Sequence, residues 1–86
     1  MARLSIVYFA WVRERIGLDG EDVEHPGDDV TIADLIGWLA GRGGAYADAL
    51  SDPARLRAAI DQSFAPLDTP LAQAREVAIF PPVTGG

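Results

Sequence analysis

The chain contains no cysteine and no lysine, and it has one histidine. Without cysteine it can form neither a disulfide nor a thiolate metal site. Without lysine its side chains offer no primary amine as a nucleophile. We expect His25, just before Pro26, to lie in an exposed loop, where a single histidine is more often solvated than catalytic. We therefore expect no metal site and little covalent chemistry from the side chains.

Motifs of independent enzymes are also missing. The sequence has no phosphate-binding loop of the Walker type, no GxGxxG and no GxSxG. Ser63 has no neighbouring base that would activate it. The carboxylates are numerous but do not form a recognisable pair. These absences argue against an independent enzyme and favour a binding or carrier function.

Long hydrophobic runs are absent too. The longest mainly apolar run, Leu4–Val12, is too short to span a bilayer. Charged residues follow it directly, and no signal-peptide cleavage site appears. The formal net charge is −6, and no basic stripe offsets it. We therefore predict a cytoplasmic protein that binds neither membranes nor nucleic acid.

The acidic residues are unevenly distributed. Seven of the thirteen lie between Asp19 and Asp34. One interpretation is a solvated face that keeps the protein soluble. The other is a surface that attracts a basic partner. The sequence leaves both open.

Hydrophobic residues make up 49% of the 86 positions, which is typical of one globular domain. The segment from Arg3 to Ala10 is rich in β-branched and aromatic residues and predicts a strand. The next ten residues predict a turn or short helix. An acidic segment over 21–29, stopped at Pro26-Gly27, predicts a short edge strand.

The clearest predicted element is a helix that begins after Thr31. Thr31 is a good N-cap, and Asp34 three residues later completes an approximate capping box. We expect the helix to end near 41–44, with a left-handed glycine as its cap. Gly37 weakens the helix unless packing compensates or the helix approaches the sheet closely there. An apolar stripe with helical spacing is formed by Ile32, Leu35, Ile36 and Leu39.

The remaining segments predict one short helix and a strand-rich C-terminal half. Residues 46–50 suggest the helix, whereas 55–60 could be either helix or strand. A turn at Asp61-Gln62 predicts a hairpin, with Pro66 and Pro70 limiting its second arm to an edge strand or loop. Residues 76–80 predict the last strand. The order β-β-α-β-β-β predicts an α+β domain, a mixed sheet with one main helix across a single face.

Side-chain alternation predicts which residues this helix covers. Successive strand residues point to opposite faces. Tyr8 and Ile79 should face the helix, together with Leu4, Ile6 and Val77. Phe9, Phe64 and Phe80 should then lie on the other side, where clustered aromatics often form an interface. A different register, or a loop that covers them, is the alternative.

The last six residues, Pro81–Gly86, predict a stiff arm with a slim tip. Proline favours an extended course, and the arm can reach about 20 Å. Gly85 and Gly86 carry no side chains and could enter a narrow channel. A terminal carboxylate is ionised at neutral pH and reacts only after activation. A partner enzyme and ATP would have to supply that activation, unless this is simply a frayed terminus.

Three segments carry a family resemblance. The strand order and the final Gly-Gly resemble the β-grasp, ubiquitin-like fold. The segment EVAIFPPVTGG, residues 76–86, resembles the C-terminus of the small subunits of molybdopterin synthase, which are MoaD-type sulfur carriers. The segment YFAWVRERIG, residues 8–17, resembles that family's first strand and turn. The segment RAAIDQSFAPLDTPL, residues 57–71, resembles its third-strand hairpin.

The resemblance implies a β-grasp domain over 1–80 and a tail over 81–86. It implies that an adenylating enzyme of the MoeB type uses ATP to activate Gly86, with Gly85 beside it. A sulfur donor protein would then form a thiocarboxylate. The large subunit would accept the tail and pass the sulfur to cyclic pyranopterin monophosphate, in a complex of two small and two large subunits. This chain would bind no cofactor and would be the sulfur-donating, non-catalytic subunit.

The resemblance also assigns residues to the partner interface. Partner-facing hydrophobic positions match Phe9, Phe64 and Phe80, and Arg13 matches a position near them, although Arg13 could be a solvated turn residue. The tail that enters the partner is Pro81, Pro82, Val83 and Thr84, followed by the two glycines. Two alternatives stay open: a sulfur carrier for thiazole, cysteine or tRNA thiolation, or a β-grasp interaction module whose Gly-Gly is incidental.

Overall fold

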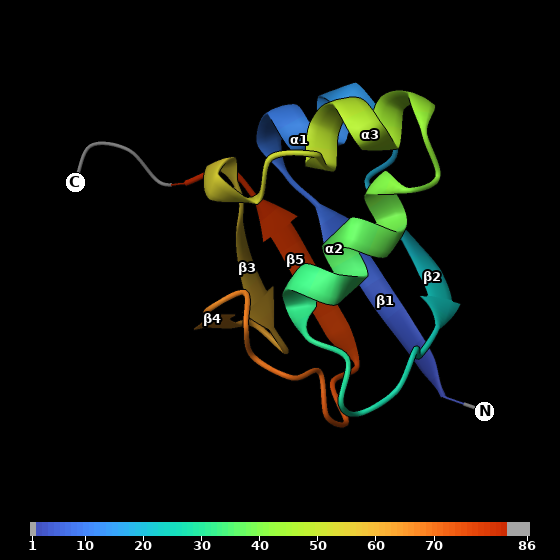
Figure 1. Ribbon diagram of the computed structural model, residues 1–86, viewed down its shortest axis with the longest axis vertical. Coiled ribbons are helices and arrows are strands. Elements are labelled where there is room, and N and C mark those ends of the chain that lie inside the picture. The colour runs from blue at the N-terminus through green and yellow to red at the C-terminus, as the bar shows by residue number, and fades with distance from the viewer. Residues whose placement is uncertain (1, 83–86) are drawn as a thin grey trace.

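The structure, a computed structural model, describes residues 2–82 of the 86-residue chain. A sheet and three α-helices make up the domain (Figure 1). The strands are β1 Arg3–Tyr8, β2 Gly20–Glu24, β3 Arg57–Ile60, β4 Ser63–Ala65 and β5 Glu76–Phe80. The helices are α1 Ala10–Ile16, α2 Ile32–Ala40, α3 Gly44–Leu50 and the short 3₁₀ helix η1 Pro53–Arg55.

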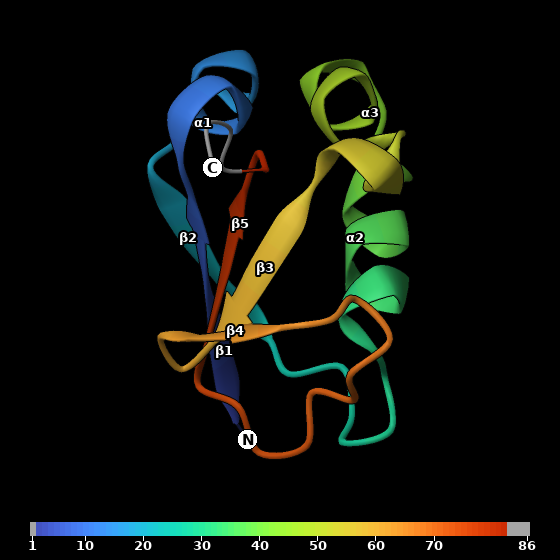
Figure 2. The ribbon, with the colours of Figure 1, turned by 90° about the vertical axis from the view of Figure 1, so that its left-hand side faces the viewer.

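The five strands form one mixed sheet in the order β2-β1-β5-β3-β4. β1 and β5 run parallel, and the other neighbours run antiparallel. The C-terminal strand β5 therefore occupies the centre, and the acidic β2 is an edge strand as predicted. With the sheet seen nearly edge-on, α2 and α3 lie on one side of it (Figure 2). The predicted α+β mixed sheet with its main helix across one face is confirmed.

The core lies between the sheet and α2. In β1 the buried positions alternate with more exposed ones, because every second side chain points at the helix. Tyr8 and Ile79 are buried as predicted, and the whole apolar stripe of α2 is buried opposite them. Burying each such side chain contributes roughly 1.5–3 kcal/mol. The core members predicted from the sequence are Leu4, Ile6, Tyr8, Val77 and Ile79, with Ile32, Leu35, Ile36 and Leu39 from the helix.

The capping of α2 agrees with the sequence at its start and differs at its end. The Asp34 backbone N–H donates to Thr31 Oγ1 at 3.1 Å, and the Thr31 N–H donates to the Asp34 carboxylate at 3.2 Å, which completes the capping box. A left-handed glycine was expected near 41–44; the C-cap residue itself, Gly41, has a φ of −64°, so the cap of α2 is not left-handed. The left-handed φ of 80° belongs to Gly43, which starts α3. The chain therefore turns directly from one helix into the next.

The role suggested for Gly37 as a close-approach residue is also wrong. A Cβ built on Gly37 meets no atom within 4 Å, and the residue is exposed. It lies on the solvent side of α2, so the helix does not need a glycine there to approach the sheet.

Two short helices close one end of the sheet (Figure 1). α1 follows β1 directly through Ala10, whose φ is 54°, and ends at the left-handed Gly17. The guanidinium carbons of Arg15 and Arg55 each lie 5.1 Å from the Trp11 ring centroid. These cation–π contacts connect α1 with η1. The sequence predicted a helix or turn at α1 and a helical piece at α3, and both are helices.

The ambiguous segment 55–60 divides into the end of η1 and the strand β3. A two-residue turn joins β3 to β4, and both its residues, Asp61 and Gln62, have positive φ, as a type I′ hairpin turn requires. The Asp61 carboxylate accepts hydrogen bonds from the N–H groups of Arg75 and Glu76 at 2.9 and 3.0 Å. The turn is thereby fastened to the start of β5.

Candidate functional site

The tail leaves the domain from the middle of the sheet. Phe80, the last residue of β5, pairs with Arg57 of β3. The Phe9 N–H donates to the Ile79 carbonyl at 3.1 Å, so the other side of β5 is occupied to its end as well. Pro81 and Pro82 follow and are half-buried. The remaining predicted tail residues, Val83, Thr84, Gly85 and Gly86, lie outside the described residues.

Three aromatic side chains lie near this exit, on the side of the sheet opposite α2. Phe64 is 81% exposed and Phe9 47%, whereas Phe80 is half-buried. The ring centroids of Phe64 and Phe80 lie 5.6 Å apart, within the usual range for an aromatic pair. We call Phe9, Phe64 and Phe80 the aromatic face. Alternation predicted that these residues point away from the helix, and the structure places them so.

The register extends the aromatic face into an apolar band across the sheet. One row of paired residues crosses all five strands. Its members are small or apolar: Gly20, Val7, Ala78, Ala59 and Phe64. Ala59 and Ala78 expose only 7% and 8% of their surface and are largely covered by their neighbours, whereas Phe64 is 81% exposed. The result is a flat apolar surface with an aromatic side chain at its edge, a shape suited to a protein partner.

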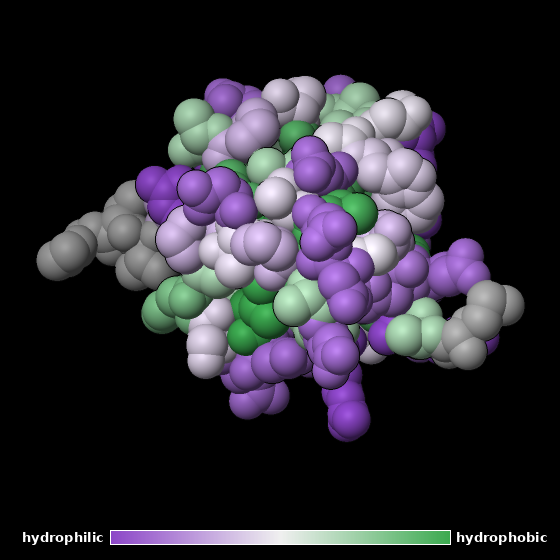
Figure 3. All heavy atoms as spheres, turned by 60° about the horizontal axis from the view of Figure 1, so that its bottom comes forward, coloured by the Kyte–Doolittle hydropathy of each residue, from purple (hydrophilic) through white to green (hydrophobic). Residues whose placement is uncertain are grey.

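Elsewhere the surface is more mixed. Figure 3 brings forward the end of the molecule that carries the loops around 25–31 and 66–75, and there hydrophobic and hydrophilic residues are interspersed. Phe64 contributes to a shallow hollow beside β3, whose lining residues are Arg57, Ala58, Phe64, Ala65, Pro66 and Phe80. The apolar surface near the tail is therefore the stronger candidate for an interface.

Arg13 lies on α1, one helical turn beyond Phe9. Its backbone N–H donates to the Phe9 carbonyl at 3.3 Å, so the two residues are neighbours. Its Nε lies 3.8 Å from the Asp19 carboxylate, and both side chains are largely exposed. An exposed ion pair of this kind contributes little to stability. A role for Arg13 at the partner interface stays a prediction.

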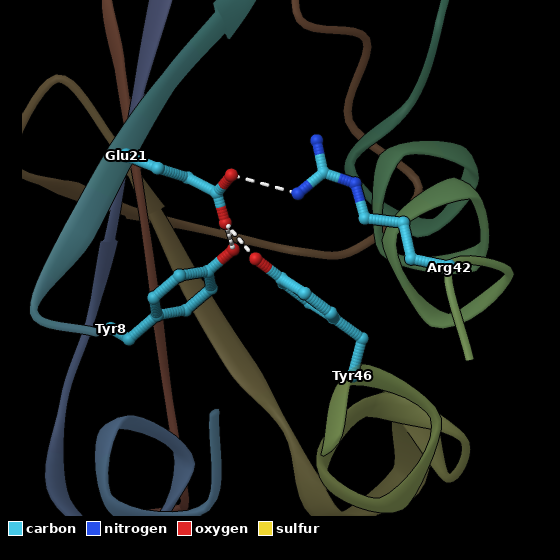
Figure 4. A network of polar contacts seen from close by, with 4 residues as sticks. All are labelled: Tyr8, Glu21, Arg42 and Tyr46. Atoms are coloured by element: carbon cyan, nitrogen blue, oxygen red, sulfur yellow. Dashed lines mark hydrogen bonds and ion pairs between the residues drawn. The ribbon is translucent and has the colours of Figure 1, made fainter. Parts of the chain in front are cut away.

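The structure also contains a polar network that the sequence patterns did not predict (Figure 4). Its centre is the Glu21 carboxylate on β2. Tyr8 and Tyr46 donate their hydroxyl hydrogens to Oε2 of Glu21 at 2.9 and 2.8 Å, and Arg42 Nη1 donates to Oε1 at 2.7 Å. The Arg42 guanidinium also stacks on Trp38 and Tyr46 at 4.7 and 5.0 Å. The network joins the sheet to α3 and to the loop before it.

Protonation in this network is set by burial and hydrogen bonding. Burial alone would raise the pKa of Glu21, but the hydrogen bonds from Arg42, Tyr46 and Tyr8 outweigh it and hold that pKa below its ordinary value. Burial, followed by the hydrogen bond to Glu21, raises the pKa of Tyr8. Both phenols therefore stay protonated beside an ionised carboxylate. This arrangement stabilises structure, and its phenols are unsuited to act as bases at neutral pH.

The acidic segment 19–34 is therefore not a uniform solvated face. Glu21 is the centre of the network, Asp34 caps α2, and Asp22 accepts a hydrogen bond from Ser5 at 2.8 Å. Among residues 2–82 the side chains of the other four acids of the segment make no hydrogen bond, and one of them, Asp19, forms a long ion pair with Arg13. Within the same range, no three potential ligands are gathered as a metal site, and no helix is long and apolar enough to cross a membrane.

A mixed five-stranded sheet, a main helix across one face and a central C-terminal strand define a β-grasp protein of the ubiquitin-like class. Its apolar band lies beside the end of the central strand β5. A model of the ThiS family matches residues 6–86, and the chain belongs to this family.

Individual relatives agree with this assignment. The chain is 40% identical over 83 residues to the molybdopterin synthase sulfur carrier subunit of Escherichia coli, a match that covers 96% of this chain and 99% of that protein. The subunit of the same name from Haemophilus influenzae is 39% identical over 84 residues, with the same coverage. Among solved structures, SAMP1 from Haloferax volcanii has a TM-score of 0.72 at 26% identity, covering 99% of this chain and all of that one.

Proposed function

We propose that this chain is the sulfur carrier subunit of a molybdopterin synthase. The observation that carries the proposal is the place where β5 ends. β5 ends in the centre of the sheet, and Phe80 joins the aromatic face to Pro81 and Pro82. A partner that covers this face receives the tail in the same contact. The similarity to two molybdopterin synthase sulfur carrier subunits along almost their whole length supports the assignment.

The chemistry requires two successive substitutions at Gly86. A carboxylate oxygen attacks the α-phosphate of ATP in a partner enzyme, pyrophosphate leaves, and an acyl adenylate forms. A sulfide equivalent from a donor protein then displaces AMP, which leaves a thiocarboxylate. Gly85 and Gly86 suit both steps because a tip without side chains fits a narrow site.

Delivery of the sulfur completes the cycle. The thiocarboxylate sulfur attacks a carbon of cyclic pyranopterin monophosphate in the large subunit and displaces an oxygen substituent from that carbon. Water then cleaves the bond between sulfur and the Gly86 carbonyl, so the sulfur stays on the pterin and the carboxylate is regenerated. The large subunit supplies the substrate pocket, and this chain supplies the sulfur. The chain binds no cofactor in this scheme; ATP is consumed by the adenylating partner.

The partners follow from these steps. A molybdopterin synthase large subunit covers the aromatic face, in a complex of two small and two large subunits. A MoeB-type adenylating enzyme and a sulfur donor protein bind in turn to load the tail. Arg13, adjacent to Phe9, lies at the border of the same contact. All these reactions take place in the cytoplasm, where ATP and the sulfur donor are available.

Intact mass spectrometry tests the loading step. The chain is incubated with ATP, a MoeB-type adenylating enzyme and a sulfur source, and the expected product is heavier by the difference between one sulfur and one oxygen. A variant that lacks Gly86 is the matched control and should stay unmodified. No mass change in the full chain would refute the carrier function.

Product formation then tests the pathway. The loaded chain is mixed with a large subunit and cyclic pyranopterin monophosphate, and molybdopterin formation is measured. A chain that is loaded but forms no molybdopterin would instead serve thiazole, cysteine or tRNA thiolation. The two assays therefore separate a wrong pathway from the absence of carrier chemistry.

A further inference from the structure

A second candidate binding surface lies on the opposite side of the molecule from the aromatic face. It is a groove beside β2 and α2, lined by Glu24, Pro26, Val30, Asp34, Leu35 and Trp38. Trp38 projects from α2 and is 52% exposed, although it is one of the largest apolar side chains. Because α2 covers the face of the sheet away from Phe64, this groove is separate from the surface assigned to the synthase partner (Figure 2).

The strand next to the groove has a free edge. β2 is outermost in the sheet, and among residues 2–82 it pairs with β1 alone. The Tyr8 N–H donates to the Asp19 carbonyl, and the His25 N–H donates to the Ala2 carbonyl, so odd-numbered residues of β2 bond toward β1. In an antiparallel ladder the intervening residues direct their backbone groups the other way. The outward donors and acceptors therefore belong to Gly20, Asp22 and Glu24.

We propose that this edge and groove bind an extended basic segment of a partner protein by β-strand addition. An added strand would exchange backbone hydrogen bonds with Asp22 and Glu24. Its side chains would alternate between two environments. Those directed toward α2 meet Leu35 and Trp38 and should be apolar. Those on the other side lie opposite Asp22 and Glu24 and should be lysine or arginine.

Charge favours such a segment over other occupants. Asp22 and Glu24 pair with Ser5 and Arg3, so their side chains lie on the face of β2 away from α2, where the arginines of an added strand would come. Asp28 and Asp29 lie in the loop between β2 and α2. The whole chain carries a formal charge of −6. Opposite charges on paired strands stabilise the pair, and like charges destabilise it. A second copy of this chain would place acidic β2 against acidic β2, so self-pairing is disfavoured.

A synthetic peptide tests the proposal. The probe alternates valine and arginine over six residues, and its control has glutamate in place of each arginine. We expect the arginine peptide to shift the amide NMR signals of Gly20, Asp22 and Glu24 together with the indole signal of Trp38. Binding should weaken as salt concentration rises. The glutamate peptide should bind at least about tenfold more weakly, a difference of about 1.4 kcal/mol.

N-methylated peptides separate strand addition from simple charge attraction. Methylation of the amides that face β2 should weaken binding by about tenfold or more, whereas methylation of the alternate amides should not. Trp38→Ala should weaken binding without unfolding the chain, since the side chain is exposed. Equal effects of the two methylation patterns, or an unchanged Trp38 signal, would overturn the proposal. Concentration-dependent shifts in β2 without peptide would indicate self-association and would overturn it as well.

Discussion

Glu21 connects parts of the chain that are distant in the sequence. It lies on β2, and its hydrogen-bond donors come from β1, from α3 and from the loop between α2 and α3. Its side chain is only 19% exposed. Because three donors from three parts of the chain bind this one carboxylate, its replacement should weaken contacts between all of these parts.

Replacing Glu21 tests this role. Glu21→Gln removes the charge that Arg42 meets and leaves one amide group that cannot accept from three donors. We expect the free energy of unfolding to fall by about 1–3 kcal/mol, measured by urea denaturation. Glu14→Gln, at an exposed position of α1, is the control and should change it by less than about 0.5 kcal/mol. Equal effects of the two substitutions would contradict the role assigned to the network.

The same carboxylate predicts a pH dependence. Its folded-state pKa lies below the ordinary value of 4.5, so the unfolded chain binds more protons in this range. The contribution of Glu21 to stability is therefore complete above pH 4.5 and is lost as the pH falls through the lowered folded pKa. We expect thermal unfolding temperatures to fall in this acidic range, and to fall less steeply in Glu21→Gln. Parallel curves for both proteins would be inconsistent with this assignment.

Phe64 offers a matched test of the partner surface. It is 81% exposed, so Phe64→Ala should leave the fold intact. Removal of an aromatic anchor weakens binding by about 2 kcal/mol or more, roughly thirtyfold, at many interfaces. We expect that loss for binding to a molybdopterin synthase large subunit, measured by calorimetry. Trp38→Ala, on the opposite side of the molecule, should bind the large subunit as the unmodified chain does.

The residues of the aromatic face and those of the network differ in how far a sequence can predict them. Alternation of side chains along a single strand was sufficient to assign Phe9 and Phe80 to one face of the sheet, because this pattern does not depend on the neighbouring strands. Predicting the hydrogen-bond partners of Glu21 requires more than the sequence of its own strand. Its partners depend on the register of β2 against β1 and on the path from α2 into α3. A carboxylate that faces the core side of a predicted edge strand was the one available signal.

At the scale of elements, the helix α2 contains one residue whose replacement should increase the stability of the fold. Gly37 lies within the helix, is exposed and has space for a side chain. Gly37→Ala should raise the free energy of unfolding by about 1 kcal/mol, because alanine loses less backbone entropy. Gly43→Ala is the contrasting variant and should lower it, since a φ of 80° is unfavourable for alanine. Chemical denaturation distinguishes them, and stabilisation by both would contradict the assigned backbone geometry.

Elements with strong local signals were predicted well. The capping box and the apolar stripe of α2 are both local, and the hairpin turn is encoded by two adjacent residues. Segment 55–60 was ambiguous because leucine, arginine and alanine are good helix formers. Its strand conformation comes from pairing with β5 and β4, which are contacts that the segment itself does not encode. Glycine positions in the α2–α3 turn were likewise decided by how α3 packs.

At the scale of the whole molecule, charge should govern association. The sequence pI is about 4.4, far below neutral pH. Near that pH the net charge vanishes, and the exposed aromatic face is no longer opposed by repulsion between copies. We expect light scattering to rise as the pH approaches 4.4 and to fall with Phe64→Asp. Scattering that is independent of Phe64 would exclude the aromatic face as the contact.

The central position of β5 has a mechanical consequence. A partner that draws in the tail would pull on the middle strand of the sheet, which is paired with β1 on one side and β3 on the other. A force along β5 acts on its hydrogen bonds to β1 and to β3 at the same time. These hydrogen bonds must therefore break together and cannot open one after another. We therefore expect the domain to stay folded when its C-terminus is pulled.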